Sequence, residues 1–303
     1  MKSDIEHMQR CFALAEQGRF TARPNPVVGC VLVKDGVVVG EGWHQVAGQA
    51  HAEINAMQQA GEQARAATAF VSLEPCAHHG RTGPCVDALL QAGIKRVVYG
   101  MQDPNPLVAG KGLELLRAAG VQIEGPFMET AARALNPGFI KRMQLGLPYV
   151  RCKLAMSLDG RTAMASGESR WITGAEARTD VQQWRARSCA VLSGVNTILQ
   201  DDPSLTVRMD EYKCKQPLRV IVDSTLRTPP AAKLLQQAGN ILLATTHADK
   251  EKVAGLRSGA SKVVESTLSI QEFPDTKGQV DLHKLLQHLA QEQHCNEILL
   301  ESG

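Results

Sequence analysis

Short apolar runs alternate with amphipathic segments along the whole chain, and this alternation limits the possible folds more than any other feature. In the first half, Lys34-Asp35-Gly36 joins two β-branched runs, and Asp-Gly in that position predicts a hairpin. Strands alternating with helices then favour an α/β domain whose sheet is largely parallel on one side of the hairpin. The spacing predicts strands over 27–33, 37–40, 68–73, 96–99 and 121–124, and helices over 4–18, 52–60, 84–92 and 112–119.

The pattern lapses between Asn136 and Pro148, around a basic helical stretch, and then restarts. A chain of 303 residues has the length of two domains at roughly 150 residues each. We therefore expect one domain over 1–147 and a second α/β domain over 148–303. In the second, the pattern predicts strands over 149–156, 190–194, 218–223, 241–245 and 297–301, a weaker strand near 262–265, and helices over 175–187 and 281–293.

Charge and composition exclude several classes of protein. Lysine and arginine total 33 against 31 aspartates and glutamates, and this balance of +2 argues against a general nucleic-acid or membrane-surface binder. A hydrophobic content of 44% is that of a folded globular chain. No apolar run approaches the roughly 18 residues of a spanning helix, and acidic residues stand where a signal peptide would be apolar. We expect a cytoplasmic protein without membrane or nucleic-acid partners.

The eight cysteines are spread through the chain, unlike the dense framework of a small secreted domain. In a reducing compartment each is then a small buried side chain or a metal ligand. His51-Ala52-Glu53, Pro75-Cys76 and Cys85 form the most informative group. One histidine and two thiolates supply the three protein ligands of a catalytic zinc site. Glu53, two residues after the histidine, suits a proton shuttle, as in the zinc nucleobase deaminases.

A structural role for these residues is also possible, in either of two forms. A structural zinc site would need a fourth ligand, which His78 or His79 can supply, and would give the carboxylate no role. Alternatively, the cysteines are simply buried. Cys76 follows a predicted strand and Cys85 opens a predicted helix, where open α/β sheets bind ligands, and this placement favours the catalytic site.

Polar side chains near this group suit an anionic substrate, such as one with a nucleotide-like phosphate. The eight residues between the cysteines include His78, His79 and Arg81, which either bind an anion or belong to a solvated loop. Asn25 and Asn105 lie in proline-rich turns. Their amides can bind a pyrimidine or ribose edge, although a plain turn role accounts for them equally well.

Several long motifs resemble the bifunctional deaminase/reductase family of riboflavin biosynthesis. They are HAEINA (51–56), EPCAHHGRT (74–82), MQDPNP (101–106), KLAMSLDGRTA (153–163), GESRWIT (167–173) and DDPSLTVR (201–208). The resemblance covers essentially the whole chain. It implies an α/β protein with a cytidine-deaminase-like domain over 1–147 and a dihydrofolate-reductase-like domain over 148–303.

The resemblance also implies two consecutive reactions. The first domain would hydrolytically deaminate 2,5-diamino-6-ribosylamino-4(3H)-pyrimidinone 5′-phosphate with Zn²⁺, and the second would reduce the ribosyl side chain to ribityl with NADPH. It further favours self-association. It assigns zinc to His51, Cys76 and Cys85 and the proton shuttle to Glu53; NADPH to Ala155, Trp171, Thr197, Asp201, Ser224 and Gly303; and the reductase substrate to Ser169, Arg185, Leu205, Arg208 and Glu301.

The residues alone support the second activity less strongly. No Gly-x-Gly-x-x-Gly follows a strand, so a Rossmann fingerprint is absent. Arg185 and Arg208 are suitable phosphate donors and Trp171 can cover a planar ring, but surface ion pairs or a core aromatic account for them as well. The chain ends at Glu301-Ser302-Gly303, where family members continue, so we expect the reductase domain to lack its C-terminal end.

Three alternatives follow. In the first, the chain is a deaminase with an inactive, truncated reductase domain. In the second, it is a single-activity deaminase of a nucleoside or RNA base. In the third, it is a zinc-stabilised interaction module without enzymatic activity. An aromatic content of 4% argues against a nucleic-acid channel.

Overall fold

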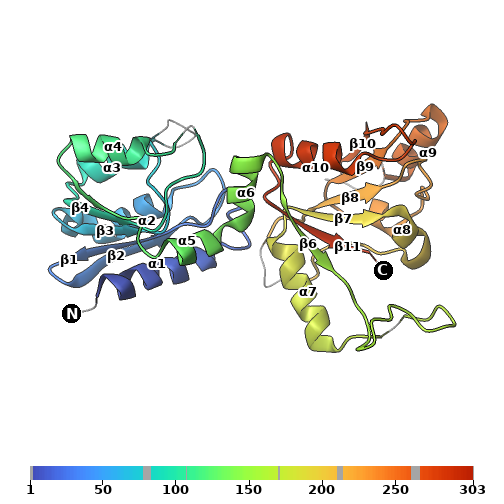
Figure 1. The fold of residues 1–303 in the computed structure, drawn as a ribbon, viewed down its shortest axis with the longest axis horizontal. Coiled ribbons are helices and arrows are strands. Elements are labelled where there is room, and N and C mark those ends of the chain that lie inside the picture. The colour runs from blue at the N-terminus through green and yellow to red at the C-terminus, as the bar shows by residue number, and fades with distance from the viewer. Residues whose placement is uncertain are drawn as a thin grey trace. The chain divides into compact units, whose positions relative to one another are not determined.

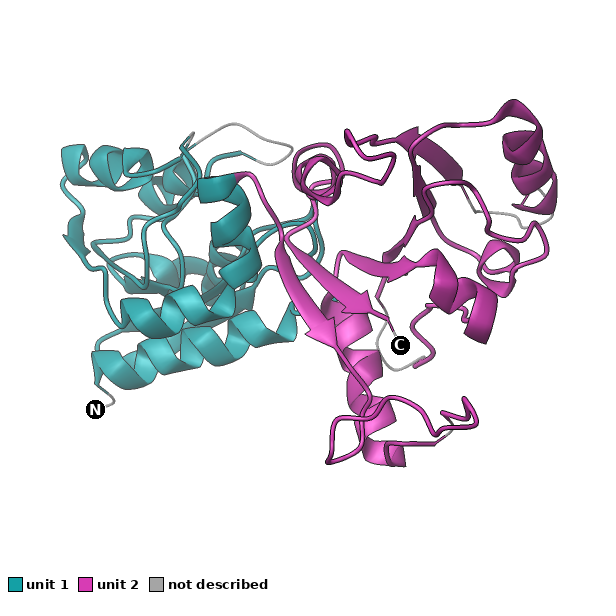
Figure 2. Ribbon diagram, turned by 45° about the vertical axis from the view of Figure 1, so that its right-hand side comes forward, with its two compact units in different colours: residues 1–145 teal, residues 146–303 magenta. Residues whose placement is uncertain are grey.

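The computed structural model describes residues 3–77, 83–106, 108–169, 171–209, 214–260 and 267–302. The chain divides into two compact units, Met1–Leu145 and Gly146–Gly303, coloured separately in Figure 2. Each unit has its own sheet and its own buried clusters.

The first unit is built on a five-stranded sheet in the order β2-β1-β3-β4-β5. β1 and β2 form an antiparallel hairpin, whereas β3, β4 and β5 are parallel, as the sequence pattern predicts. Asp35 and Gly36 both have positive φ (51° and 77°), the backbone that a tight hairpin turn requires. The strands are β1 (Gly29–Lys34), β2 (Val37–Trp43), β3 (Thr68–Val71), β4 (Arg96–Tyr99) and β5 (Gln122–Glu124).

Helices cover both faces of this sheet (Figure 1). One face packs against α2, α3 and α4 through a cluster that includes Leu32, Val71 and Leu89. The other face packs against α1 through Met8 and Phe70, among others. The helices are α1 (Asp4–Gln17), α2 (Ala52–Ala60), the 3₁₀ turn η1 (Gly61–Ala64), α3 (Cys85–Gln91), α4 (Lys111–Ala118), α5 (Glu129–Leu135) and α6 (Pro137–Leu145).

α2 lies unusually close to β2, and small residues on both elements make this possible. A Cβ atom at Gly42 would stand 2.4 Å from the carbonyl oxygen of Ala52, and one at Gly40 would stand 2.3 Å from that of Ala56. Only glycine fits at these two strand positions. The close contact fixes the first turn of α2, and therefore His51 and Glu53, against the sheet.

The second unit contains a six-stranded sheet in the order β10-β9-β8-β7-β11-β6, and every neighbouring pair is parallel. The carboxyl ends of all six strands therefore lie along one edge, as the arrows in Figure 1 show. The strands are β6 (Tyr149–Lys153), β7 (Ala190–Gly194), β8 (Leu218–Val222), β9 (Ile241–Thr245), β10 (Leu268–Glu272) and β11 (Glu297–Glu301).

Alternate residues of the central strands serve two separate buried clusters, as expected for a sheet covered on both faces. Ile221 and Leu243 pack with α8, α9 and η2, whereas Val220 and Leu242 pack with α10. The helices of this unit are α7 (Ala175–Arg187), α8 (Val195–Asp201), the 3₁₀ turn η2 (Lys233–Gln236), α9 (Lys250–Ala260) and α10 (Leu282–Gln291).

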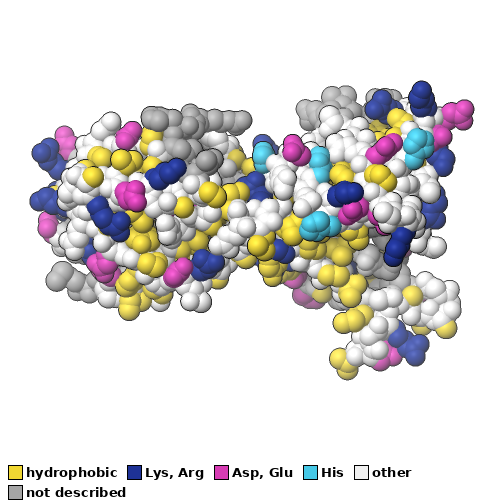
Figure 3. Space-filling model, turned by 45° about the horizontal axis from the view of Figure 1, so that its top comes forward, with side chains coloured by type: hydrophobic (Ala, Val, Ile, Leu, Met, Phe, Trp, Pro, Cys, Tyr) yellow, Lys and Arg dark blue, Asp and Glu magenta, His cyan; other side chains and the backbone are white. Residues whose placement is uncertain are grey.

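The structure adds elements that the sequence pattern does not predict, namely α5, α8, α9, β10 and the 3₁₀ turns η1 and η2. The strand expected over 149–156 ends at Lys153. The weaker strand expected near 262–265 lies outside the described residues. No helix in the described ranges combines the length and apolar character needed to cross a membrane. Basic and acidic side chains are interspersed on the face that Figure 3 shows, in line with the net charge of +2.

Candidate active sites

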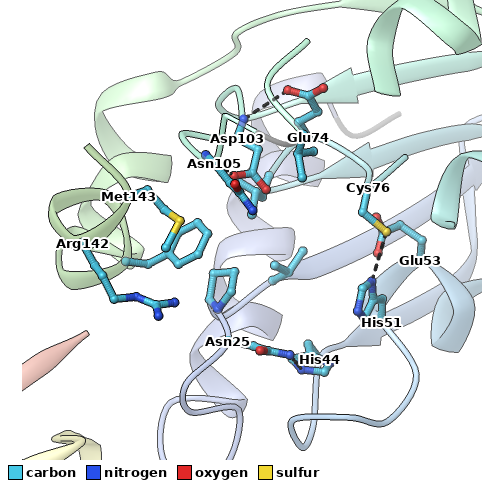
Figure 4. Close-up of a pocket in the computed structure, with 15 residues that line it drawn as sticks. Asn25, His44, His51, Glu53, Glu74, Cys76, Asp103, Asn105, Arg142 and Met143 are labelled. Carbon is cyan, nitrogen blue, oxygen red and sulfur yellow. Dashed lines mark hydrogen bonds between the residues drawn. The ribbon is translucent and has the colours of Figure 1, made fainter. Parts of the chain in front are cut away.

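A cavity of about 240 Å³ opens in the first unit. Its walls come from the segment before β1, the loop after β2, the start of α2, the segment after β3, the 103–108 loop and α6 (Figure 4). The lining residues are Asn25, Pro26, Val28, His44, His51, Glu53, Leu73, Glu74, Cys76, Asp103, Asn105, Val108, Phe139, Arg142 and Met143.

Three metal-ligating side chains meet at one end of this cavity. His51 is the residue before α2, Cys76 follows β3, and Cys85 is the first residue of α3. His51 Nδ1 lies 3.2 Å from the Sγ atom of Cys85 and 3.5 Å from that of Cys76. The three ligand atoms all lie within 4.8 Å of one another, close enough to bind one ion. The structure thus brings together the three residues that the sequence singled out.

The chemistry of this donor set fits zinc. The neighbouring Cys85 side chain lowers the pKa of the Cys76 thiol to about 4, while the pKa of Cys85 is raised, because two sulfur atoms this close share one negative charge. The backbone N–H of Cys85 also donates to Cys76 Sγ over 3.4 Å. A divalent cation stabilises both thiolates, and one imidazole with two thiolates is a ligand set that zinc prefers.

Glu53 lies in the first turn of α2, next to these ligands, and is 3% exposed. Burial raises the pKa of Glu53 to about 7, and the negative charge of Cys76 adds to this effect. Figure 4 shows the Glu53 side chain beside Cys76 and above His51. The carboxyl group is therefore buried at the metal-binding end of the cavity rather than on the solvent side of the helix.

A hydrogen-bonded pair, Asn25 and His44, forms the wall below the metal ligands. His44 Nδ1 lies 3.1 Å from the carbonyl oxygen of Ala50, which can only accept, so Nδ1 carries the proton. Nε2 then accepts from the amide nitrogen of Asn25 over 3.0 Å. Burial lowers the pKa of His44, which keeps the ring neutral. The amide oxygen of Asn25 consequently faces away from His44, as Figure 4 shows.

The 103–110 loop forms the upper wall and is held by Glu74. One carboxylate oxygen of Glu74 accepts from the backbone N–H groups of Asp103 (3.2 Å) and Gly110 (3.0 Å). The Asp103 carboxylate in turn accepts from the backbone N–H of Asn105 over 2.8 Å. Burial raises the pKa of Asp103 to about 6. Asn105 is therefore held at the cavity by two buried acidic side chains.

Asn25 and Asn105 stand out in the sequence, whereas most of the remaining wall does not, including His44, Glu74, Phe139, Arg142 and Met143. α6 contributes three of these five, and its sequence indicates only a basic helical stretch between domains. Glu74 has a local signal, because it directly precedes Pro75-Cys76. His78, His79 and Arg81, considered as a fourth zinc ligand or as anion-binding residues, lie outside the described residues.

In the second unit, several of the residues expected at NADPH follow the carboxyl ends of strands in the parallel sheet. Ala155 follows β6, Ser224 follows β8, and Thr197 and Asp201 lie on α8, directly after β7. Open α/β sheets bind ligands at this edge. Trp171 is instead 72% exposed and stacks on Arg178 of α7, with the guanidinium carbon 4.4 Å from the ring centre. Gly303 lies outside the described residues.

The residues expected at the reductase substrate also differ in exposure, some being buried and others lying on the surface. Arg185 and Glu301 form a buried bidentate ion pair, with N–O distances of 2.5 and 2.9 Å. Leu205 is buried, whereas Arg208 is exposed on the same segment. Ser169 is exposed in the segment that connects β6 to α7. Arg185 and Glu301 thus bind each other, an arrangement that the sequence does not indicate.

Comparisons with known proteins agree with this division of the chain. The family model described as "Cytidine and deoxycytidylate deaminase zinc-binding region" matches residues 1–101, and that of the "RibD C-terminal domain" matches residues 148–303. The riboflavin biosynthesis protein RibD of Escherichia coli is 48% identical over 311 aligned residues, which cover 99% of this chain and 82% of the relative. The chain belongs to the RibD family.

Solved RibD structures share the fold. Acinetobacter baumannii RibD superposes with a TM-score of 0.87 at 46% identity, covering 98% of this chain and 80% of that one. A Thermotoga maritima protein described as a diaminohydroxyphosphoribosylaminopyrimidine deaminase/5-amino-6-(5-phosphoribosylamino)uracil reductase gives a TM-score of 0.84 at 32% identity, with the same coverage of both chains. The predicted fold class is therefore confirmed, with a cytidine-deaminase-like first domain and a RibD reductase domain of the dihydrofolate-reductase type.

Membership of the RibD family makes this chain a bifunctional enzyme of riboflavin biosynthesis with a deaminase and a reductase domain. The deaminase domain is of the zinc-binding kind, and its His-Cys-Cys cluster fits that ion. The RibD reductase domain uses NADPH. The expected activities and both expected cofactors are thus confirmed at the level of the family.

Proposed function

We propose that this chain catalyses two consecutive steps on one phosphorylated pyrimidine. The first domain, which we place over 1–147, deaminates 2,5-diamino-6-ribosylamino-4(3H)-pyrimidinone 5′-phosphate, and the second, over 148–303, reduces the ribosyl side chain to ribityl with NADPH. The name of the Thermotoga maritima relative supports this substrate class. The observation that carries the proposal is the cluster of His51, Cys76 and Cys85 beside the buried Glu53.

In the deaminase site, His51, Cys76 and Cys85 hold the zinc ion. When bound there, zinc would act as a Lewis acid and lower the pKa of a coordinated water toward neutrality. Glu53 accepts a proton from the attacking water and delivers it to the amino group, which leaves as ammonia while the ring carbon gains the oxygen. The depth of Glu53 in the cavity keeps this proton transfer away from bulk solvent.

The remaining cavity wall supports binding of a ribotide. The amide oxygen of Asn25 can accept from an N–H of the pyrimidine, and Asn105 offers a second amide group. Of the described lining residues, Arg142 is the only lysine or arginine. Its guanidinium group points into the cavity from α6, opposite the metal ligands (Figure 4), and suits the substrate phosphate.

In the reductase site, we assign Ala155, Trp171, Thr197, Asp201, Ser224 and Gly303 to NADPH and Ser169, Arg185, Leu205, Arg208 and Glu301 to the substrate. Ala155 and Ser224 follow the carboxyl ends of β6 and β8, and Thr197 and Asp201 lie on the helix that follows β7, which supports the assignment. Hydride transfer requires only that cofactor and substrate be held face to face, so no protein nucleophile is needed. We further propose a cytoplasmic enzyme that self-associates and binds neither nucleic acid nor membranes.

Glu53→Gln tests the deaminase assignment. The amide keeps the size of the side chain but cannot carry the proton, so we expect ammonia release from the diaminopyrimidine ribotide to fall at least about 100-fold. Bound zinc, measured by atomic absorption, should remain at the wild-type level. Glu62→Gln, the same change at an exposed position just after α2, is the matched control. Normal ammonia release by Glu53→Gln would refute the proton-shuttle role.

The two activities are best measured separately, with and without NADPH. Ammonia release followed by NADPH oxidation supports both steps. Ammonia release without NADPH oxidation would show that the second unit is inactive in this chain. Deamination of tRNA or of a free nucleoside in preference to the ribotide would replace the proposed substrate.

A further inference from the structure

Residues 202–208 of the second unit form a segment with a defined shape but no helix or strand. It follows α8 and carries both Leu205 and Arg208, which we have assigned to the reductase substrate. Leu205 is buried and has a φ of 53°, a left-handed backbone that leucine rarely adopts. Such a conformation persists only where neighbouring groups fix the chain on both sides.

Side chains from outside the segment supply this restraint. Arg185 donates from Nη1 to the carbonyl oxygen of Thr206 over 3.0 Å. Gln182, one helical turn earlier on α7, accepts from the backbone N–H of Arg208 over 2.9 Å. These two side chains therefore hold alternate residues of the segment from the same face of one helix.

A third side chain holds the residue between them. The amide of Gln216 accepts from the N–H of Val207 over 2.9 Å and donates to its carbonyl oxygen over 3.0 Å. Val207 thus exchanges two hydrogen bonds with one partner, as residues of neighbouring antiparallel strands do, but here the partner is a side-chain amide. Three consecutive residues, Thr206 to Arg208, are thus each bound by a side chain.

Arg185 also connects this segment to the end of the central strand β11. Its Nε and Nη2 groups occupy both carboxylate oxygens of Glu301, and Ser193 of β7 donates to the carbonyl oxygen of Glu301 over 2.6 Å. The segment is therefore joined to the carboxyl edge of the sheet, where the cofactor residues lie. Movement of either part would break buried, charge-assisted hydrogen bonds.

We propose that Gln182 and Gln216 are positioning residues that, together with the substrate-binding residue Arg185, hold 205–208 in the shape that binds the reductase substrate. The inference rests on the proposed reductase function and adds Gln182 and Gln216 to its machinery. Gln182 fixes the backbone from which the Arg208 side chain extends, and Arg185 fixes the left-handed turn at Leu205. If the segment is ordered in only a fraction of the molecules, the apparent affinity for substrate equals the intrinsic affinity multiplied by that fraction.

Gln182→Leu removes the acceptor at nearly constant volume. We expect the KM of the reductase for the deaminated ribotide to rise about 3- to 10-fold with less than a twofold change in kcat, because an ordering hydrogen bond is lost. Amide hydrogen exchange in a peptide spanning 205–208 should become about 10-fold faster. Gln182→Glu, which keeps an acceptor oxygen, should restore slow exchange.

The bifunctional chain offers internal controls. Ammonia release by the first unit should be unchanged in every variant, and Gln183→Leu, at the exposed neighbouring position, should leave both exchange and KM unchanged. Gln216→Ala alters an exposed side chain, so it tests the same segment without a buried substitution. It should raise KM and hydrogen exchange in the same direction as Gln182→Leu.

Unchanged exchange and unchanged KM in both Gln182→Leu and Gln216→Ala would refute the inference. Faster exchange throughout the second unit would refute it as well, because it would indicate a general stabilising role. If the wild-type chain oxidises no NADPH, the proposed reductase function fails, whereas the exchange comparison still decides whether these side chains order the segment.

Discussion

Three carboxyl groups line the cavity of the first unit, and their surroundings differ. Burial raises the pKa of Glu53 to about 7 and that of Asp103 to about 6. Glu74 is also buried, but it accepts two backbone N–H groups. An apolar environment favours the protonated form of a carboxyl group. The acid suited to carrying a proton near neutral pH is therefore the one beside the metal ligands, Glu53.

Asp103 makes stability depend on pH. Its folded-state pKa lies above the ordinary value of 3.8, so the folded state binds the proton more tightly than the unfolded state does. The free energy of unfolding should therefore fall as pH rises from about 4 to about 6, by up to about 3 kcal/mol. Asp103→Asn removes this dependence and should be more stable than the wild type at pH 7 but not at pH 4.

Urea unfolding of both proteins between pH 4 and pH 7 measures this difference. Comparison of wild type with variant cancels effects that the two share, such as loss of metal at low pH. Glu114→Gln, at an exposed position on α4, is the control and should follow the wild-type profile. A stability difference that stays constant over this range would contradict the prediction.

The sequence identified the chemical centre of the first site but only part of its wall. His51, Glu53, Cys76 and Cys85 stand out because metal chemistry requires particular residue types at restricted spacings. Asn25 and Asn105 were visible because proline-rich turns present them. Arg142 and His44 had no such signal, since only the tertiary fold brings them to the cavity. The pairing of Arg185 with Glu301 could not be predicted either, because the two residues are 116 positions apart and only the tertiary fold brings them together.

Individual elements were predictable where side-chain pattern and local propensity agree. The strands Arg96–Tyr99, Ala190–Gly194 and Ile241–Thr245 are buried, rich in aliphatic and β-branched residues and bounded as predicted. α8 was missed because Val195, Asn196 and Thr197 are poor helix formers. α9 contains Gly259, where a Cβ atom would stand 2.1 Å from the carbonyl oxygen of Pro230. Tertiary packing thus requires a residue that weakens the local helical signal.

β8 contains a charged residue in the core of the second unit. Arg219 is fully buried and donates to the carbonyl oxygen of Leu234 within η2 and to those of Gln237, Ala238 and Gly239 just after it. Burial lowers the pKa of Arg219 to about 10. Carbonyl groups at the end of a helical turn favour a cation, so this guanidinium connects η2 to the sheet.

Arg219→Met should destabilise the second unit by about 3 kcal/mol, because four carbonyl groups, that of Leu234 buried and the others partly buried, lose their donor. Arg219→Lys should recover only part of this loss, since one ammonium group cannot reproduce the planar fork. Urea unfolding measures both effects. Arg257→Met, at an exposed position on α9, should change stability by less than about 0.5 kcal/mol. An equal effect of the two methionine substitutions would contradict the assigned role of Arg219.

At the scale of the whole molecule, the two sites draw on separate parts of the chain. All three metal ligands and Glu53 belong to the first unit, whereas the Arg185 network and the parallel strand ends belong to the second. Each unit also has its own buried clusters. The chemistry of one site can therefore be removed without altering the residues of the other.

Zinc removal should separate the activities. Treatment with a chelator should stop ammonia release, lowering it at least about 100-fold, while NADPH oxidation with the already deaminated ribotide continues at the original rate. Restored zinc should restore ammonia release. Circular dichroism should show that the first unit stays folded, because its core clusters do not depend on the metal. A parallel loss of both activities, or unfolding of the first unit, would contradict this prediction.

The position of β11 between β6 and β7 has a consequence for synthesis on the ribosome. Among the strands that the structure describes, β6 pairs with β11 alone, and about 150 residues separate the two strands. At 5–20 residues per second, β6 leaves the exit tunnel roughly 7–30 s before β11 does. During this interval the nascent chain displays an unpaired strand, so the order of synthesis, rather than the strength of the finished sheet, sets the period in which a chaperone can act on it.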